Sequence, residues 1–339
     1  MPIQINSPKR YYRSTTLSLI KKMQRIELFK NIRTVLSKAG FYVSELYTMR
    51  LTGFDVVARR DDTLLIVKVL SNIDSLTEDI ANEIRTLSSL LKASPLLIGE
   101  KNGTGPLEDD VVYFRYGVQA ITIETLKNNL LEGIPIHVFA APGGLYVNLD
   151  QKRLKQIRVE QNISLGTFAR HVNISRRTVQ MYEEDGMNAR IDVAIKIEEL
   201  LQSAITTPID IFKEFELNKK ITPGFTEKSY NIKDFQEEIF SLLQKVGYKI
   251  IPMDRCPFEA LSKEKEKIIL TSVHEYNERL VKKAQVISSI SKITEKHAVV
   301  FVDKDGKKKN IKGTPIIAKK ELKKIREPEE IVDLIIERI

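Results

Sequence analysis

The spacing of hydrophobic and polar positions changes along this chain of 339 residues. From residue 23 to about 135, short apolar runs alternate with segments of helical period such as 26–38 and 77–91. Residues 150–204 have helical periods only, and residues 231–339 return to the alternating pattern. Short apolar runs predict strands, whereas a spacing of three and four predicts helices. We therefore expect α/β domains on either side of a central all-helical domain.

The turn residues between these parts predict how they are connected. Residues 136–149 hold two apolar runs around Ala141-Pro142-Gly143-Gly144, which predicts a β-hairpin connector. Residues 205–230 are polar and interrupted by Pro and Gly, so we expect a linker there. Residues 1–22 are basic, with two tyrosines among the cations. They form either a flexible arm that touches nucleic acid or an ordinary loose terminus.

The two α/β domains, 23–135 and 231–339, share one order of elements. Residues 257–261 repeat the pattern of 53–57, and residues 267–273 repeat that of 64–70. We interpret the domains as an internal repeat, that is, as two copies of one fold. The alternative is a chance similarity between two generic α/β patterns of strands, helices and turns.

The central domain carries the most specific motif. Asp150, Ser164 and Ser175 are suited to cap three successive helices, and Asn173 suits a tight turn before the third. Two short helices joined by such a turn are typical of a helix-turn-helix, whose second helix enters the DNA major groove. The segment SLGTFARHVNISRRTVQMYEEDG closely resembles the Cro/C1-repressor type. It departs from that type at Asn173, where Gly is usual, and at Leu165, where Gln is usual.

The third helix of this domain supplies candidate DNA contacts. Val179 and Tyr182 should turn inward, so the opposite side would read base edges with Arg176, Arg177, Gln180 and Met181. Arginine can bind guanine O6 and N7 with two donors. Hydroxyls near helix N-termini and one lysine are candidate phosphate contacts: Ser164, Ser175, Thr178 and Lys155. Glu183, Glu184 and Asp185 at the far end would be repelled by phosphate, so the N-terminal half of the helix should dock.

The flanking domains contain part of a nuclease pattern. Asp55 on one strand and Lys68 on the next match PD-(D/E)xK, which needs two carboxylates for Mg²⁺ and a lysine near the attacking water. The second acid is missing from its usual position, because Ile66 occupies it, and Glu27 on the first helix or Glu45 is the alternative source of another acid. In the C-terminal copy, Glu259 replaces Asp55 and Thr271 stands in the place of Lys68. We therefore expect degenerate restriction-endonuclease-like folds, no catalytic residues and no enzyme activity.

Composition narrows the class of protein further. Lys and Arg total 54 against 45 Asp and Glu, a net charge of +9 that favours polyanionic partners. The single cysteine and four scattered histidines provide no zinc-finger spacing, and we expect no metal and no cofactor. One cysteine also excludes an internal disulfide and favours a reducing, cytoplasmic compartment. No apolar run reaches the ~18 residues of a membrane span, so we expect no membrane partner.

The chain resembles the archaeal family of HTH-type transcriptional regulators. The resemblance lies in FDVVARRDDTLLIVKVLSNIDSL, VVYFRYGVQAI, AAPGGLYVNLD and the helix-turn-helix. It implies a nuclease-like domain, a Cro/C1-type reader and a C-terminal domain, and it names no effector. We expect a sequence-specific regulator that binds double-stranded DNA as a homodimer, because one reader covers too few base pairs, with the dimer contact in the flanking domains. The rivals are a metal-dependent nuclease guided by the helix-turn-helix and a scaffold that uses it for protein contact.

Overall fold

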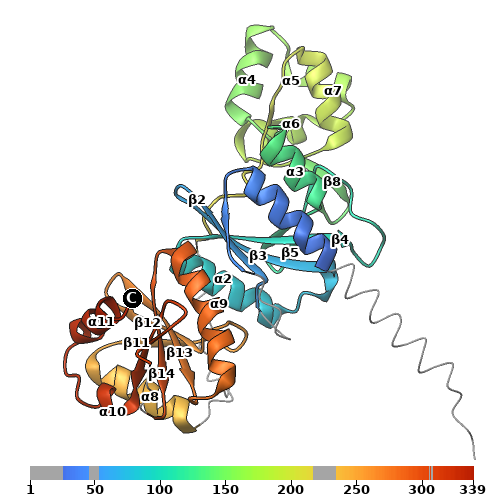
Figure 1. Cartoon of the computed structure of the whole chain (residues 1–339). Coiled ribbons are helices and arrows are strands. Elements are labelled where there is room, and N and C mark those ends of the chain that lie inside the picture. The colour runs from blue at the N-terminus through green and yellow to red at the C-terminus, as the bar shows by residue number, and fades with distance from the viewer. Residues whose placement is uncertain (1–25, 46–52, 217–233, 305, 307) are drawn as a thin grey trace, which may run out of the picture. The chain divides into compact units, whose positions relative to one another are not determined.

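A computed structural model describes residues 26–45, 53–216 and 234–339, apart from positions 305 and 307 (Figure 1). These residues form two compact units built from alternating stretches of the chain. One unit contains the described parts of Met1–Ala39, Val69–Leu76 and Leu96–Ile211. The other contains those of Gly40–Lys68, Thr77–Pro95 and Phe212–Ile339. The predicted arm, residues 1–22, lies outside the described residues.

The first half of the chain builds a mixed sheet with helices between its strands. Its strands are β1 (Tyr42–Val43), β2 (Val56–Arg60), β3 (Thr63–Asn72), β4 (Ser94–Lys101), β5 (Val111–Arg115) and β6 (Val118–Ile121). The helices are 26–38, the 3-10 turn η1 (Ile73–Ser75), α2 (Glu78–Leu91) and α3 (Ile123–Leu131). Thr77 and Thr122 cap α2 and α3, each accepting a bond from a first-turn amide. The strand order is β1-β2-β3-β4-β6-β5.

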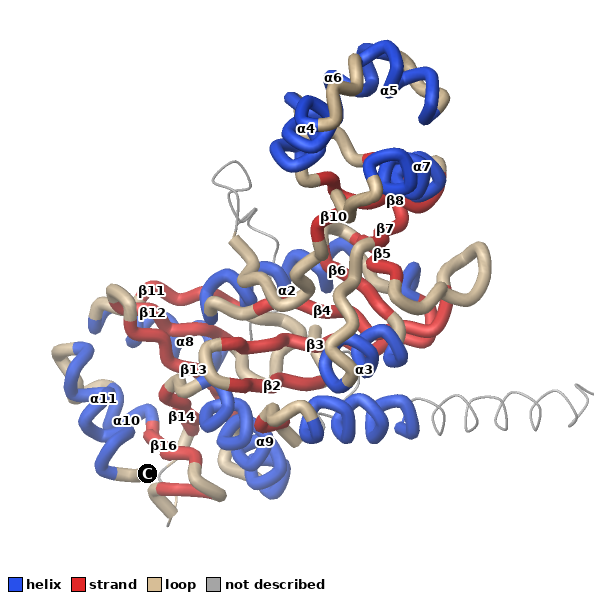
Figure 2. Tube along the Cα trace, turned by 90° about the horizontal axis from the view of Figure 1, so that it is seen from above, coloured by secondary structure: helices blue, strands red, loops and turns tan. Residues whose placement is uncertain are grey.

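The C-terminal part of the chain repeats this order. Its elements are α8 (Asp234–Val246), β11 (Lys249–Pro252), β12 (Ala260–Glu264), β13 (Lys267–His274), α9 (Glu278–Thr294), β14 (His297–Val302), β15 (Asn310–Ile311), β16 (Thr314–Ala318), α10 (Lys319–Leu322) and α11 (Pro328–Glu337). The strand order is β11-β12-β13-β14-β16-β15, the same succession as in the first sheet (Figure 2). The predicted repeat of one α/β fold is therefore confirmed. No described helix is long and apolar enough to cross a membrane.

Strand register sets the residue equivalence between the repeats and corrects one expectation. Two-residue turns join β2 to β3 and β12 to β13, at Asp61-Asp62 and Lys265-Glu266, and the first residue of each has positive φ. The register pairs Val57 with Ile66 and Leu261 with Leu270. The C-terminal counterpart of Lys68 is therefore Ser272. The expectation that Thr271 corresponds to Lys68 was wrong by one position. In a strand, a shift of one position places the side chain on the opposite face of the sheet.

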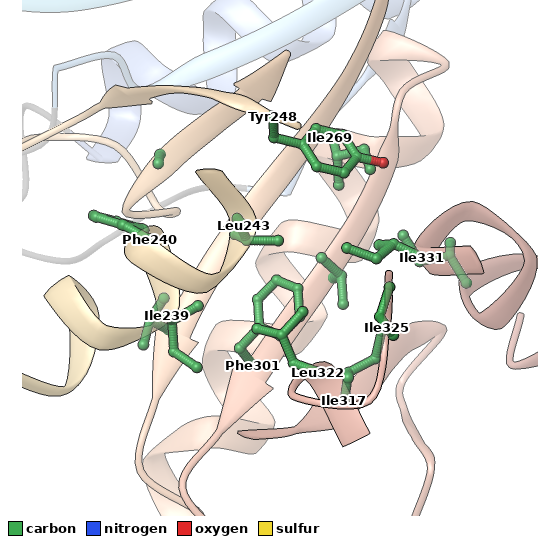
Figure 3. Close-up of a cluster of buried hydrophobic side chains, with 14 residues drawn as sticks. Ile239, Phe240, Leu243, Tyr248, Ile269, Phe301, Ile317, Leu322, Ile325 and Ile331 are labelled. Atoms are coloured by element: carbon green, nitrogen blue, oxygen red, sulfur yellow. The ribbon is translucent and has the colours of Figure 1, made fainter. Parts of the chain in front are cut away.

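The core of the C-terminal repeat shows how its layers pack. The helices α8, α10 and α11 cover one face of the sheet, where Ile239 and Leu243 meet Phe301, Ile317 and Leu322 (Figure 3). All five side chains are buried. Alternate residues of β14 point to the other face and are also buried, as expected for a strand covered on both sides.

The predicted connector is a hairpin and also part of a larger sheet. Its strands are β7 (Val138–Ala141) and β8 (Gly144–Leu149). Two short strands, β9 (Ala189–Arg190) and β10 (Thr206–Thr207), pair with β8, and β7 pairs with β5. The expected linker at 205–230 thus begins differently: Ile205 is buried, and β10 is bonded to β8. The polar side chains of β10 gave no strand pattern, because this strand is held by backbone pairing with β8. Residues 217–233 lie outside the described part.

The central domain has the four predicted helices, α4 (Gln151–Glu160), α5 (Leu165–Val172), α6 (Arg176–Glu184) and α7 (Ile191–Leu201) (Figure 1). One apolar core holds them together, with Leu154, Phe168, Val179 and Ile197 fully buried. Val147 of β8 belongs to the same core, so one face of the small sheet packs against the helices.

The two repeats contact each other within the second unit. The Gly53 amide donates to the Arg255 carbonyl at 2.5 Å, and the Glu45 amide donates to Ser289 Oγ at 3.0 Å. Glu83 of α2 accepts a bond from the Arg255 amide at 2.9 Å. The surfaces around α2 and α9 are therefore used for contact inside one chain.

Candidate nucleic-acid interface

Local interactions set the geometry of the helix-turn-helix. The Thr167 amide donates to Ser164 Oγ at 3.1 Å, and the Thr178 amide donates to Ser175 Oγ at 3.0 Å. Both serines thus cap helices as predicted. Asn173 ends α5 in the left-handed region, at φ +61°, which asparagine tolerates better than most residues. The departure from glycine at this turn is therefore compatible with the fold.

The predicted inner and outer sides of α6 are observed. Val179 and Tyr182 are buried in the core of the domain. Arg176, Arg177 and Gln180 are exposed, whereas Met181 is half-buried. The start of α6 therefore presents two guanidinium groups to solvent, and the core holds the helix from behind.

The guanidinium of Arg176 lies directly over Gly166 of α5. A Cβ atom added at Gly166 would stand 2.8 Å from Nη2, 2.9 Å from Nε and 3.0 Å from Cζ of Arg176. Real Cβ atoms almost never come closer than 3.0 Å to another heavy atom. Glycine therefore leaves the space that this orientation of Arg176 needs. Gly166 has no recognisable signal in the sequence, because its contact with Arg176 joins two different helices.

The candidate phosphate contacts are partly occupied within the domain. The Ser164 hydroxyl donates to Thr167 Oγ1 at 3.0 Å, and Ser175 Oγ lies 2.8 Å from Thr178 Oγ1. Lys155 Nζ is 3.1 Å from Glu184 Oε1, and both side chains are at least half exposed. An exposed pair of this kind contributes at most about 1 kcal/mol, so Lys155 stays available to a phosphate.

A buried ion pair joins α4 to α6 on the inner side of the domain. Arg158 and Glu183 are 8% and 7% exposed and form two parallel bonds, Nε to Oε1 at 2.5 Å and Nη2 to Oε2 at 2.9 Å. Arg158 Nη1 also donates to the Ile163 carbonyl at 2.9 Å. The bond to Glu183 raises the pKa of Arg158. Glu183 therefore ties α6 to α4, and its carboxylate is paired inside the domain.

The nuclease-like position of the first repeat holds one carboxylate and one lysine. Asp55 and Lys68 are 2% and 5% exposed, and Asp55 Oδ2 lies 3.3 Å from Lys68 Nζ. Ile66 is fully buried, where the pattern calls for the second acid. No group of three metal-ligating side chains occurs among the described residues. The residues present do not fit the divalent metal that this fold uses for cleavage.

The corresponding position of the second repeat has different partners. Glu259 Oε2 accepts bonds from Ser272 Oγ at 2.8 Å and from the Val273 amide at 2.9 Å. Glu259 Oε1 forms an ion pair with Lys283 of α9. The acid is thus bonded to the neighbouring strand β13 and to helix α9.

Comparison with known proteins matches both parts of this arrangement. A family model for the PD-(D/E)XK superfamily domain matches residues 25–136, and one for a helix-turn-helix matches residues 154–206. Three relatives share the printed name "Putative HTH-type transcriptional regulatory protein". That of Methanosarcina acetivorans is 40% identical, that of Haloquadratum walsbyi 36% and that of Haloarcula marismortui 33%. Each alignment covers 93% of this chain and 98% of the relative. No solved structure matches.

Proposed function

Because this chain belongs to the archaeal family of HTH-type transcriptional regulatory proteins, we propose that it recognises specific double-stranded DNA with α6. In this proposal the N-terminal half of α6 enters the major groove, and two copies bind two half-sites. The protein acts by occupying DNA. It performs no chemistry on DNA.

The exposed pair Arg176 and Arg177 carries this proposal. Both side chains emerge from the first turn of a capped helix whose opposite side is packed in the core. Each guanidinium can bind one guanine with two donors, which contributes roughly 1–3 kcal/mol of discrimination. Gln180, one turn further, is exposed on the same helix and can bond an adenine edge, and half-buried Met181 can contact a thymine methyl.

Phosphate contacts would position the helix on the duplex. Ser164, Ser175 and Thr178 lie at helix N-termini, where free amides and the positive end of the dipole favour a phosphate. Lys155 on α4 can leave its ion pair with Glu184 and bind a phosphate instead. Glu183 presents no obstacle, since Arg158 neutralises it inside the domain.

The experiment begins with selection of bound oligonucleotides from a random pool, followed by titration of the enriched sequence. The double variant Arg176→Ala/Arg177→Ala should lose specific binding, by about 2–6 kcal/mol if both guanidiniums read bases. Lys155→Ala should weaken binding to all sequences and lower the salt slope by about 1. Lys196→Ala, an exposed cation on α7, serves as the matched control. An unchanged footprint in the double variant would refute the proposal and favour the scaffold role.

DNA cleavage is the second candidate, favoured by the match to the PD-(D/E)XK superfamily domain. It is tested by incubating plasmid with the protein and Mg²⁺ or Mn²⁺. We expect intact plasmid, because Ile66 replaces the second acid. Metal-dependent cutting that Asp55→Ala abolishes would establish a nuclease instead.

A further inference from the structure

A row of partly exposed aromatic side chains crosses three neighbouring strands of the first unit. Phe114 of β5 and Phe139 of β7 meet edge to face with ring centroids 6.2 Å apart. Phe139 stacks on Tyr146 of β8 at 6.0 Å. Arg190 of β9 is the register partner of Tyr146 and ends the row. Figure 2 shows β5, β7 and β8 following one another in this order.

The row lies on the face of the sheet that points away from the helical core. Val138 and Val147 pack against the helices, and the residues next to them, Phe139 and Tyr146, point to the other side. Phe114 is 41% exposed, and Phe139 and Tyr146 are half-buried. Within the described residues, the face is thus only partly covered.

The Arg190 end of the row is connected to the C-terminal end of α6. The strand β9, which holds Arg190, follows the C-terminal end of α6 after the short segment 185–188. Tyr182 lies in the last turn of α6, whereas Arg176 begins that helix. The aromatic row is therefore next to the C-terminal end of α6, and a partner there would leave the N-terminal end free.

The charges at the end of the row suit a symmetric partner. Arg190 Nε lies 3.1 Å from Asp192 Oδ1, and these side chains are 58% and 57% exposed. A two-fold axis brings the same patch of two copies together, so such a patch must complement itself. With both signs present, Arg190 of one copy can face Asp192 of the other. Phe, Tyr and Arg are also enriched in the buried centres of protein interfaces.

We propose that Phe114, Phe139, Tyr146 and Arg190 form the surface through which two copies of this chain associate. The proposal rests on the proposed function, since two reading helices are needed for two half-sites. It moves the expected dimer contact to the sheet beside the helical domain. The faces around α2 and α9 already make contacts within one chain.

The test measures mass by sedimentation over a range of protein concentrations. The wild type should dimerise, and Phe114→Glu should be monomeric, because a carboxylate would be buried against aromatic rings. Thermal unfolding checks that the variant is folded. The Phe114→Glu protein should still bind an oligonucleotide with a single half-site through Arg176 and Arg177. Binding of this oligonucleotide therefore reports on DNA recognition, and the mass reports on dimerisation.

Charge reversal gives a second, milder test. Arg190→Asp and Asp192→Arg should each weaken the dimer by about tenfold or more, because like charges then face each other across the axis. The double reversal should restore it. Reversing the exposed pair Glu124 and Lys127 on α3 is the control and should have no effect.

Three results would overturn the proposal. One is a wild type that stays monomeric at every concentration. Another is a folded Phe114→Glu protein that dimerises like the wild type. The third is loss of affinity for a single-stranded oligonucleotide in Phe114→Glu without any change in mass, which would mark the row as a base-stacking surface.

Discussion

Replacing Gly166 with alanine should separate DNA reading from stability. Gly166 is the second residue of α5 and lies beneath the guanidinium of Arg176. The new methyl group would enter the space that this guanidinium occupies. Since the guanidinium is the end of a long flexible side chain, it can move aside without disturbing the core.

The distances give the size of both effects. A normal contact is about 3.5 Å, so a Cβ at 2.8 Å displaces Nη2 of Arg176 by roughly 0.7 Å. Bonds to guanine span only about 2.7–3.2 Å, so this shift breaks a two-donor contact, which costs about 1–3 kcal/mol, or about 5–150-fold in affinity. Alanine is a better helix former than glycine by about 0.5–1 kcal/mol, so the free energy of unfolding should stay equal or rise.

Fluorescence anisotropy with the selected oligonucleotide measures the affinity, and urea unfolding measures the stability. The sharpest control is the same substitution in an Arg176→Ala background, where Gly166→Ala should no longer change the affinity. If Gly166→Ala binds the selected sequence as tightly and selectively as the wild type, Gly166 does not position Arg176 for DNA. An equal loss in the Arg176→Ala background would lead to the same conclusion, because the effect would then come from another route.

Two further predictions concern stability. Glu183→Gln should lower the free energy of unfolding by about 3–5 kcal/mol, because it leaves the buried charge of Arg158 without its carboxylate. Lys155→Ala, at an exposed pair, should cost at most about 1 kcal/mol in the same urea titration, and equal losses would contradict the argument. Burial raises the pKa of Glu321, but the hydrogen bonds that its carboxylate accepts have a larger, opposite effect, and the bond from Arg338 is the strongest of them. The pKa of Glu321 is therefore about 2, below the ordinary 4.5. This stabilisation is present above pH 4.5 and is lost as the pH falls towards 2. Circular dichroism of Glu321→Gln should show a weaker acid dependence, and an unchanged one would count against it.

The local features of this protein can be predicted from its residues alone. Capping by Ser164 and Ser175 and the left-handed turn at Asn173 depend on residues within four positions of one another. The inward side of α6 follows from the helical period alone. The same holds for the strand and helix order of the repeats and for the hairpin at 136–149. Such features are readable because the atoms that decide them are neighbours in the chain.

Contacts between residues far apart in the chain depend on how the elements pack. Backbone pairing of β12 with β13 showed that Ser272, and not Thr271, corresponds to Lys68. The bond between Arg158 and Glu183 spans 25 residues, and the contact of Gly166 with Arg176 joins two helices. The aromatic row exists only because β5 pairs with the hairpin of β7 and β8. The spacing of apolar residues predicts which face of a helix or strand a side chain lies on. The partner that the side chain contacts depends on how the elements pack against one another.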